Sequence, residues 1–111
     1  MKPLKDAAGY YEVEFRDRHL ERLGFRINEI TLSPTQTVPW HYHNTITDTL
    51  YILEGNFRIY LQDPKETIDL APGESLVIIP KRPHLVTNAG ETSATFLALQ
   101  GLGEYDYVPM V

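Results

Sequence analysis

Apolar and polar residues alternate in short runs along most of this chain, and alternation with a period of two is typical of half-buried β-strands. The predicted strands are 13–15, 24–33, 49–53, 57–61, 67–70, 76–79, 84–88 and 95–99, and a further strand that starts at Pro39 carries His41 and His43. Turn residues separate them at a spacing of roughly 8–12 residues, and no long amphipathic helix pattern competes with them. The pattern therefore predicts an all-β fold, an antiparallel sandwich or barrel.

Three segments carry more specific predictions. The turn around Gly55 predicts a hairpin that pairs 49–53 with 57–61. Within 24–33 the apolar phase changes halfway, which predicts a bulge or burial on both faces. The charged run 16–22, RDRHLER, predicts a helical turn or a loop.

Length and composition are those of a single globular domain. The chain has 111 residues, of which 42% are apolar and 23% are charged, as in soluble domains of ordinary size. We expect one domain over 1–111, with an N-terminal arm over 1–12 and a C-terminal tail over 101–111. The net charge of -5 argues against a nucleic-acid partner, because nucleic-acid binding normally requires a basic patch.

Three absences narrow the location and the chemistry. No apolar run approaches the roughly 20 residues of a membrane span, and the first residues lack the apolar core of a signal peptide. We therefore expect a cytoplasmic protein with no membrane partner. The chain has no cysteine, so nitrogen and oxygen ligands alone would hold any metal.

The stretch VPWHYHNTITDTLYILEG, residues 38–55, contains the strongest chemical signal. Side chains two positions apart on a strand point to the same face, so His41 and His43 would lie side by side, with Asp48 nearby on the next strand. His84 begins a later strand that could meet the first across a small barrel. The four residues would then form a site of nitrogen and oxygen ligands with open positions for water or substrate. Such ligands suit Fe(II), Mn(II), Ni(II), Zn(II) or Cu(II), and the ligand set does not choose among these ions.

The histidines also have a simpler interpretation. A histidine in a β-protein is commonly a surface or hydrogen-bonded residue, and the His-Tyr-His pattern alone is a weak signal for a metal. The fourth histidine, His19, lies among charged residues and is predicted to be exposed to solvent.

Two motifs give the chain a resemblance to a known family. Residues 41–55 read H-Y-H, four residues, D, six residues, G, and resemble the first motif of the cupin superfamily. Residues 73–88 read G, five residues, I-P-K-R-P-H, three residues, N, and are similar to the second motif. The phrases LYILEG and APGES add to the likeness. With their connector the motifs cover residues 34–88, about half of the chain, which resembles a small single-domain cupin of the RmlC-like superfamily.

The resemblance implies a cupin double-stranded β-helix, which is an antiparallel jelly-roll barrel. It also implies that His41, His43 and His84 are metal ligands. Asp48 takes the place of the family's usual glutamate, and Asn88 belongs to a turn without being a ligand.

The function implied by the resemblance is that of a metal-dependent enzyme acting on a small oxygenated or carboxylated metabolite, of the dioxygenase, isomerase or lyase type. The alternative is a non-catalytic cupin that binds or senses a sugar or another small metabolite. In similar cupins the last strand lines the cavity, so Phe96 and Gln100 are predicted to be walls of a substrate pocket.

A homodimer is also expected, because small cupins commonly pair through edge strands. Trp40, Tyr42 and Tyr51 are predicted to face outward, and the tail from Tyr105 to Val111 adds further aromatic residues. An exposed apolar patch of that size would otherwise invite aggregation.

Two of the departures from the family's motifs, at Asp48 and Lys81, bear on the site; the others are Thr35 in place of a glycine and Ile79 in place of a proline. Because aspartate is one methylene shorter than glutamate, Asp48 would reach a metal only if its strand moved inward, and it could instead act through a water or orient an imidazole. Lys81 stands where the second motif has glycine, so it would be strained in a positive-φ turn unless the loop took a different shape. Lys81 and Arg82 would then lie near the mouth of the barrel, where they could attract an anionic substrate. The alternative is that both are solvated loop charges.

Overall fold

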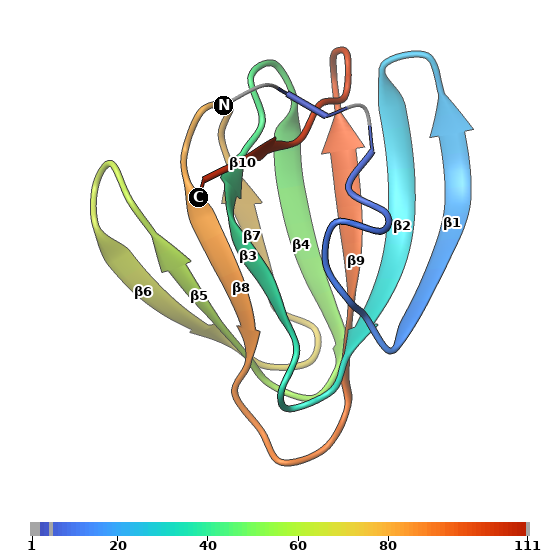
Figure 1. Cartoon of the computed structure of the whole chain (residues 1–111). Helices are drawn as coiled ribbons and strands as arrows, with labels where there is room; N and C mark the ends of the chain where they lie inside the picture. The colour runs from blue at the N-terminus through green and yellow to red at the C-terminus, as the bar shows by residue number, and fades with distance from the viewer. Residues whose placement is uncertain (1–2, 5, 111) are drawn as a thin grey trace.

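Two five-stranded antiparallel sheets face each other in the computed structural model of the chain, which describes residues 3–4 and 6–110 (Figure 1). The first sheet has the order β1-β2-β9-β4-β7, formed by β1 (Phe15–Arg22), β2 (Phe25–Leu32), β9 (Ala94–Gly101), β4 (Thr47–Glu54) and β7 (Ser75–Ile78). The second has the order β10-β3-β8-β5-β6, formed by β10 (Val108–Pro109), β3 (Thr37–Tyr42), β8 (His84–Asn88), β5 (Phe57–Leu61) and β6 (Glu66–Leu70). The predicted all-β, antiparallel jelly-roll barrel is confirmed. Among these described residues, no helix has the length and apolar character that crossing a membrane requires.

Apolar side chains from both sheets fill the space between them. Phe57, Ile59 and Leu61 of β5 are buried, whereas Arg58 between them is exposed, so the alternation in sequence selects the inward face. The ring of Phe57 meets that of Phe96 on β9 edge to face, with ring centres 5.2 Å apart. Contacts of this kind hold the two sheets together through burial of apolar surface.

Strand β2 changes from polar to apolar along its inward face. Arg26, Asn28, Ile30 and Leu32 are all buried. The strand stays in register with β9 over its whole length, and the irregularity in its pairing with β1 lies between Arg18 and Leu20 of β1. The predicted bulge within 24–33 is therefore wrong. Burial on both faces, the other predicted alternative, holds in part, because residues on the opposite face are half-buried. The apparent change of phase arises because the inward face includes two polar residues.

The turn at Gly55 carries the chain from one sheet to the other. Strand β4 pairs with β7 and β9, whereas β5 pairs with β6 and β8, so the predicted hairpin between β4 and β5 is wrong. Ile52 and Phe57 on either side of the turn are both buried in the core, and an alternating pattern fits facing strands as well as paired ones. Gly55 has a φ of 77°, and a Cβ at this position would lie 2.6 Å from the Cβ of Ala94. The crossing therefore requires glycine.

The charged run 16–22 lies within strand β1, so the prediction of a helical turn or loop is wrong. Of the predicted strand 13–15, only Phe15 belongs to β1. The strand lies at the edge of its sheet, and its charges find partners there, as when His19 contacts Glu29 at 2.8 Å. Charged side chains are typical of exposed edge strands, where they oppose pairing with other chains.

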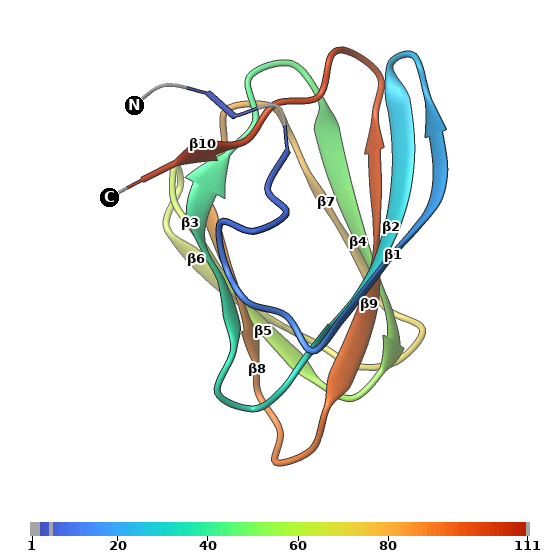
Figure 2. The same ribbon diagram turned by 45° about the vertical axis from the view of Figure 1, so that its right-hand side comes forward.

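Two segments that are far apart in sequence run together beside the barrel (Figure 2). Leu4 and Tyr107 exchange two backbone hydrogen bonds, of 2.7 and 2.8 Å. Strand β10 pairs with β3, and residues 6–14 cross the space between β3 and β1 (Figure 2). Parts of the predicted arm and tail thus complete the wall of the barrel.

Candidate metal centre

Three histidines and one aspartate converge at the end of the barrel where β3 ends and β8 begins. His41 lies on β3 and His43 directly follows it, while His84 begins β8. Asp48 comes from β4 in the facing sheet. One possible ligand atom from each of the four residues lies within 4.8 Å of those of the others. The two sequence motifs meet because β3 and β8 are neighbours, which makes His41 and His84 cross-strand partners.

Backbone carbonyls orient all three imidazoles. Nδ1 of His41 donates a hydrogen bond of 2.8 Å to the carbonyl of Pro39, and Nδ1 of His84 donates one of 2.9 Å to the carbonyl of Arg82. Nδ1 of His43 donates to the carbonyl of Asp106. Because Nδ1 carries the proton, Nε2 of each ring is left to face the cluster. A histidine whose Nδ1 is anchored in this way is well oriented to bind a metal through Nε2.

Asp48 remains ionised within the cluster. Burial raises the pKa of its carboxyl, but the neighbouring imidazoles of His43 and His84 together outweigh burial and hold that pKa well below its ordinary value. Burial lowers the pKa of His41 well below that of a free imidazole, so this ring is neutral. Burial also lowers the pKa of His43, but the carboxylate of Asp48 and the contact with Asp106 together outweigh burial, so the net shift of this pKa is upward.

Two buried atoms of the cluster, Oδ1 of Asp48 and Nε2 of His84, have no hydrogen-bond partner among the described residues. Oδ2 of Asp48 lies 3.2 Å from Nε2 of His43 and 3.5 Å from Nε2 of His84. Buried polar atoms are rarely left unpaired. Ligand atoms around an ion with bonds of about 2.0–2.2 Å lie roughly 3–4.4 Å apart. The donor set and its spacing therefore fit a divalent cation, and the short side chain of Asp48 reaches the cluster.

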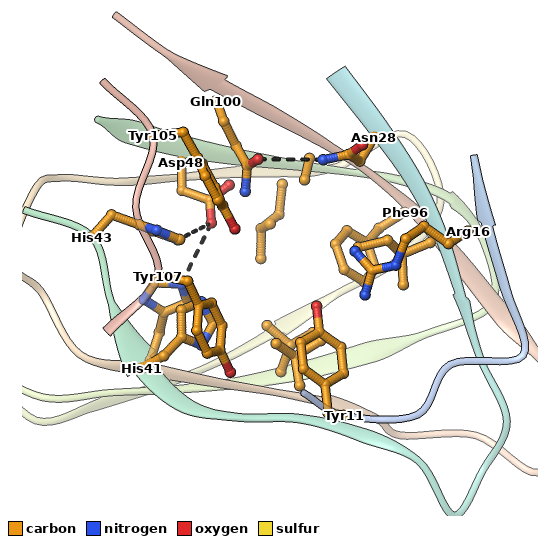
Figure 3. Close-up of a pocket in the computed structure, with 16 residues that line it drawn as sticks. Tyr11, Arg16, Asn28, His41, His43, Asp48, Phe96, Gln100, Tyr105 and Tyr107 are labelled. Carbon is orange, nitrogen blue, oxygen red and sulfur yellow. Dashed lines mark hydrogen bonds and ion pairs between the residues drawn. The ribbon is translucent and has the colours of Figure 1, made fainter. Parts of the chain in front are cut away.

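A small cavity with a volume of about 20 Å³ adjoins the cluster. Phe96 and Gln100 both line it, so the two predicted pocket residues lie beside the cluster. Oε1 of Gln100 accepts a hydrogen bond of 3.5 Å from Nδ2 of Asn28 (Figure 3). The space has room for about one or two waters, so a ligand there must be small.

The other side chains that line the cavity include Tyr11, Arg16, Tyr105 and Tyr107, and no sequence motif marks any of these four (Figure 3). The ring of Tyr107 stacks on His41 with ring centres 4.4 Å apart. Tyr105 and Tyr107 are two positions apart in the sequence, and this spacing could have indicated that their side chains point to the same side of an extended segment. The charged run around Arg16 contains no signal that singles it out.

Asp106 anchors the loop that follows β3. Its carbonyl accepts the hydrogen bond from His43, and its carboxylate accepts bonds from the backbone nitrogen and Nδ2 of Asn44, at 2.9 and 2.8 Å. A residue of the C-terminal tail therefore positions one of the clustered histidines.

The loop of the second motif keeps the shape that glycine would give it. Lys81 has a φ of 69°, and its backbone nitrogen donates to the carbonyl of His43 at 2.6 Å. The side chain of Lys81 is exposed, and the guanidinium of Arg82 pairs with Glu66. Neither side chain lines the cavity, which favours the interpretation of both as loop charges.

His19 and Asn88 lie outside the cluster, as predicted. The ring of His19 is exposed on β1 and contacts Glu29. The side-chain amide of Asn88 donates to the carbonyl of Thr92 within the turn that follows β8.

Several solved structures share this fold. An oxalate oxidase is 20% identical, with a TM-score of 0.72 over 79% of this chain and 47% of its own. An uncharacterised conserved protein with a double-stranded beta-helix domain from Klebsiella pneumoniae is 19% identical, with a TM-score of 0.76 over 86% of this chain and 77% of its own. The oxalate decarboxylase of Lactobacillus farciminis is 15% identical, with a TM-score of 0.72 over 85% of this chain and 33% of its own.

The match spans about half of the oxalate oxidase and a third of the decarboxylase, and at these identities the likeness is one of fold. No curated protein matches the sequence significantly.

The family described as Cupin domain matches residues 28–100. This region is more than half of the chain and contains all four clustered residues. Sequence motifs, sheet topology and family match agree, and the chain belongs to the cupin family.

Proposed function

We propose that His41, His43, Asp48 and His84 bind one divalent metal ion. The observation that carries this proposal is the convergence of four donor groups, two of which present buried atoms that lack a hydrogen-bond partner among residues 3–4 and 6–110. Fe, Mn, Ni, Zn and Cu are all compatible with a set of imidazoles and a carboxylate.

The bound metal would serve a metal-dependent enzyme that acts on a small oxygenated or carboxylated metabolite, with dioxygenase, isomerase or lyase chemistry. The cavity beside the cluster supports this proposal, because it gives a ligand access to the metal position. A divalent ion there would polarise a carbonyl or carboxylate oxygen. Gln100, whose carbonyl oxygen is already engaged by Asn28, is placed to orient a ligand through its amide nitrogen.

A non-catalytic binding or sensing cupin is the second candidate. Its support in the sequence came from two departures from the motifs, Asp48 in place of glutamate and Lys81 in place of glycine. Asp48 nevertheless lies in the cluster and Lys81 keeps the left-handed turn, so neither departure distorts the site. For this reason we favour the enzyme.

Elemental analysis of protein purified without added metal tests the metal proposal. We expect about one equivalent of a single divalent metal per chain, lost in His84→Ala and in His41→Ala because each substitution removes a ligand. His19→Ala is the matched control, since this histidine is exposed on β1 outside the cluster, and it should retain the wild-type content. Equal metal content in all four proteins would refute the site.

Turnover separates the enzyme from the binding protein. Oxygen uptake by the Fe(II)-loaded protein should be measured with diketones, catechols and keto acids, and product formation with uronates and other sugars. Turnover that disappears in His84→Ala would support the enzyme. Tight binding of one of these compounds without turnover would favour the binding protein.

We also propose that the protein forms a homodimer. Trp40 and Tyr42 are half-buried and Tyr105 lines the cavity, so these residues do not form the expected outer patch. A different apolar surface is available on the outer face of β4 and β7, formed by Tyr51, Leu53, Val77 and Ile79, which are 39–61% exposed. Because β7 is the edge of its sheet, a second chain can pack there and cover the patch.

A further inference from the structure

Arg16 lines the same cavity as the histidine and aspartate cluster. Figure 3 shows its guanidinium pointing into the cavity from the side opposite His43 and Asp48. Its Nη2 atom is buried and has no hydrogen-bond partner among the described residues. Within residues 3–4 and 6–110, Arg16 also takes part in no ion pair. A buried, unpaired guanidinium nitrogen is costly, and an anion in the cavity would remove the cost.

The hydroxyl of Tyr107 is a second polar group without a partner. It is buried, and no described residue forms a hydrogen bond with it. Its ring is 1% exposed and stacks on His41, so the hydroxyl belongs to a wall that adjoins the cluster. Two donors without acceptors thus line one small cavity beside the metal ligands.

We propose that this cavity binds a small carboxylate through Arg16 and Tyr107, with a second oxygen of the same molecule directed at the metal position. Arginine suits this role because its planar guanidinium matches the two oxygens of a carboxylate. The cavity volume of about 20 Å³ limits the ligand to a few non-hydrogen atoms. Only the metal end of this arrangement rests on the proposed function, because the contact with Arg16 does not require a metal.

The charge balance of the cavity favours an anion. A divalent cation together with Arg16 exceeds the single negative charge of Asp48, so the occupied cavity would be net positive. At low dielectric such an excess is unfavourable. A small carboxylate anion offsets part of this excess, whereas a neutral sugar does not.

The proposed subsite lies outside the part of the chain that matches the family. Arg16 precedes residues 28–100 and Tyr107 follows them. The anion contact is therefore a property of this chain's flanking segments, which β1 and the tail bring to the cavity. Arg16, rather than Lys81 or Arg82, would therefore supply the positive charge that attracts an anionic ligand.

Calorimetric titration of the metal-loaded protein with glycolate and with uncharged glycolamide tests the subsite. We expect glycolate to bind at least about tenfold more tightly than glycolamide, the effect of one good charge-assisted contact. Arg16→Gln should abolish this preference, and Arg16→Lys should retain part of it. Tyr107→Phe should weaken glycolate binding severalfold. Arg58→Gln, which removes an exposed arginine from the outer face of β5, is the control and should bind as wild type.

Equal binding of glycolate and glycolamide by the wild type would overturn the inference, as would wild-type glycolate affinity in folded Arg16→Gln. If Arg16→Gln does not fold, unchanged glycolate affinity in both Arg16→Lys and Tyr107→Phe would also overturn the inference.

An experiment on metal-free protein distinguishes the carboxylate subsite from the proposed metal site. Acetate should raise the melting temperature of metal-free wild type more than acetamide does, and Arg16→Gln should lose this difference. Absence of metal binding would refute the proposed function, and the acetate arm would still decide the subsite.

Discussion

Asp48 is the acidic member of the cluster, and its position near the start of β4 places its carboxylate among the histidines despite its short side chain. The carboxylate lies within 3.2 Å of His43 and 3.5 Å of His84. One oxygen faces these rings, while the other has no partner within the described part of the chain. A single carboxylate in this position supplies negative charge that, together with the three imidazoles, makes a stronger site for a dication.

Asp48→Asn should weaken divalent metal binding by at least about tenfold. The substitution keeps the shape of the side chain and removes its charge, so its effect reports the carboxylate. Isothermal titration calorimetry with Zn(II) measures the affinity. Asp69→Asn on β6, where the acid forms an exposed pair with Arg58, is the control and should not alter it. Unchanged affinity in Asp48→Asn would remove Asp48 from the ligand set.

Lys81→Gly should stabilise the protein by about 0.5–1 kcal/mol. Lys81 has a φ of 69°, where a residue with a Cβ is strained, and glycine relieves that strain at some cost in unfolded-state entropy. Its backbone hydrogen bond to the carbonyl of His43 does not involve the side chain. Urea unfolding of metal-free protein provides the measurement. Lys65→Gly, in another exposed turn, should be neutral or destabilising, and a loss of stability in Lys81→Gly would show that its φ carries no strain.

The four expected ligands could be predicted because motif spacing and strand periodicity both place them. His41 and His43 follow from the period of two, and His84 from the second motif. The places of Arg16 and Tyr107 in the cavity wall could not be predicted, because they depend on which strands lie beside which. Nothing local to a charged run or an aromatic tail shows that it ends in a buried cavity.

At the level of elements, alternation predicted where most strands lie but not which strands pair. Strands β4 and β5 are joined by a turn with hairpin chemistry, yet they belong to different sheets. Two strands show the same alternation of apolar and polar residues whether they pair within one sheet or face each other from two sheets. The difference lies in one contact, the approach of Gly55 to Ala94, which involves residues far apart in the chain.

Gly55→Ala should destabilise the protein by about 3 kcal/mol or more. Two costs combine here, the positive φ of 77° and a new Cβ only 2.6 Å from that of Ala94. Gly73→Ala is the matched control, because its φ is 86° but no atom lies within 4 Å of the added Cβ. It should cost only about 1 kcal/mol. Chemical denaturation of both variants separates conformational strain from overlap, and equal losses would contradict the close approach.

For the whole molecule, the exposed apolar surface on β4 and β7 is the feature that bears on assembly. Light scattering should give the mass of two chains, and Val77→Lys should shift it to one chain because a charge would be buried in the interface. Leu23→Lys is the control, since this fully exposed leucine lies in the turn between β1 and β2. A wild-type mass of one chain would refute the dimer.

The backbone pairing of Leu4 with Tyr107 brings together the two segments that flank the family region in the sequence. The portion that identifies the family, residues 28–100, contains every expected metal ligand and most of the residues that line the cavity, whereas four polar or aromatic lining residues precede or follow it. A fragment trimmed to that portion would keep the ligands and lose Tyr11, Arg16, Tyr105 and Tyr107. Exchanging the flanking segments between cupins would therefore change part of the cavity wall and keep all four expected metal ligands.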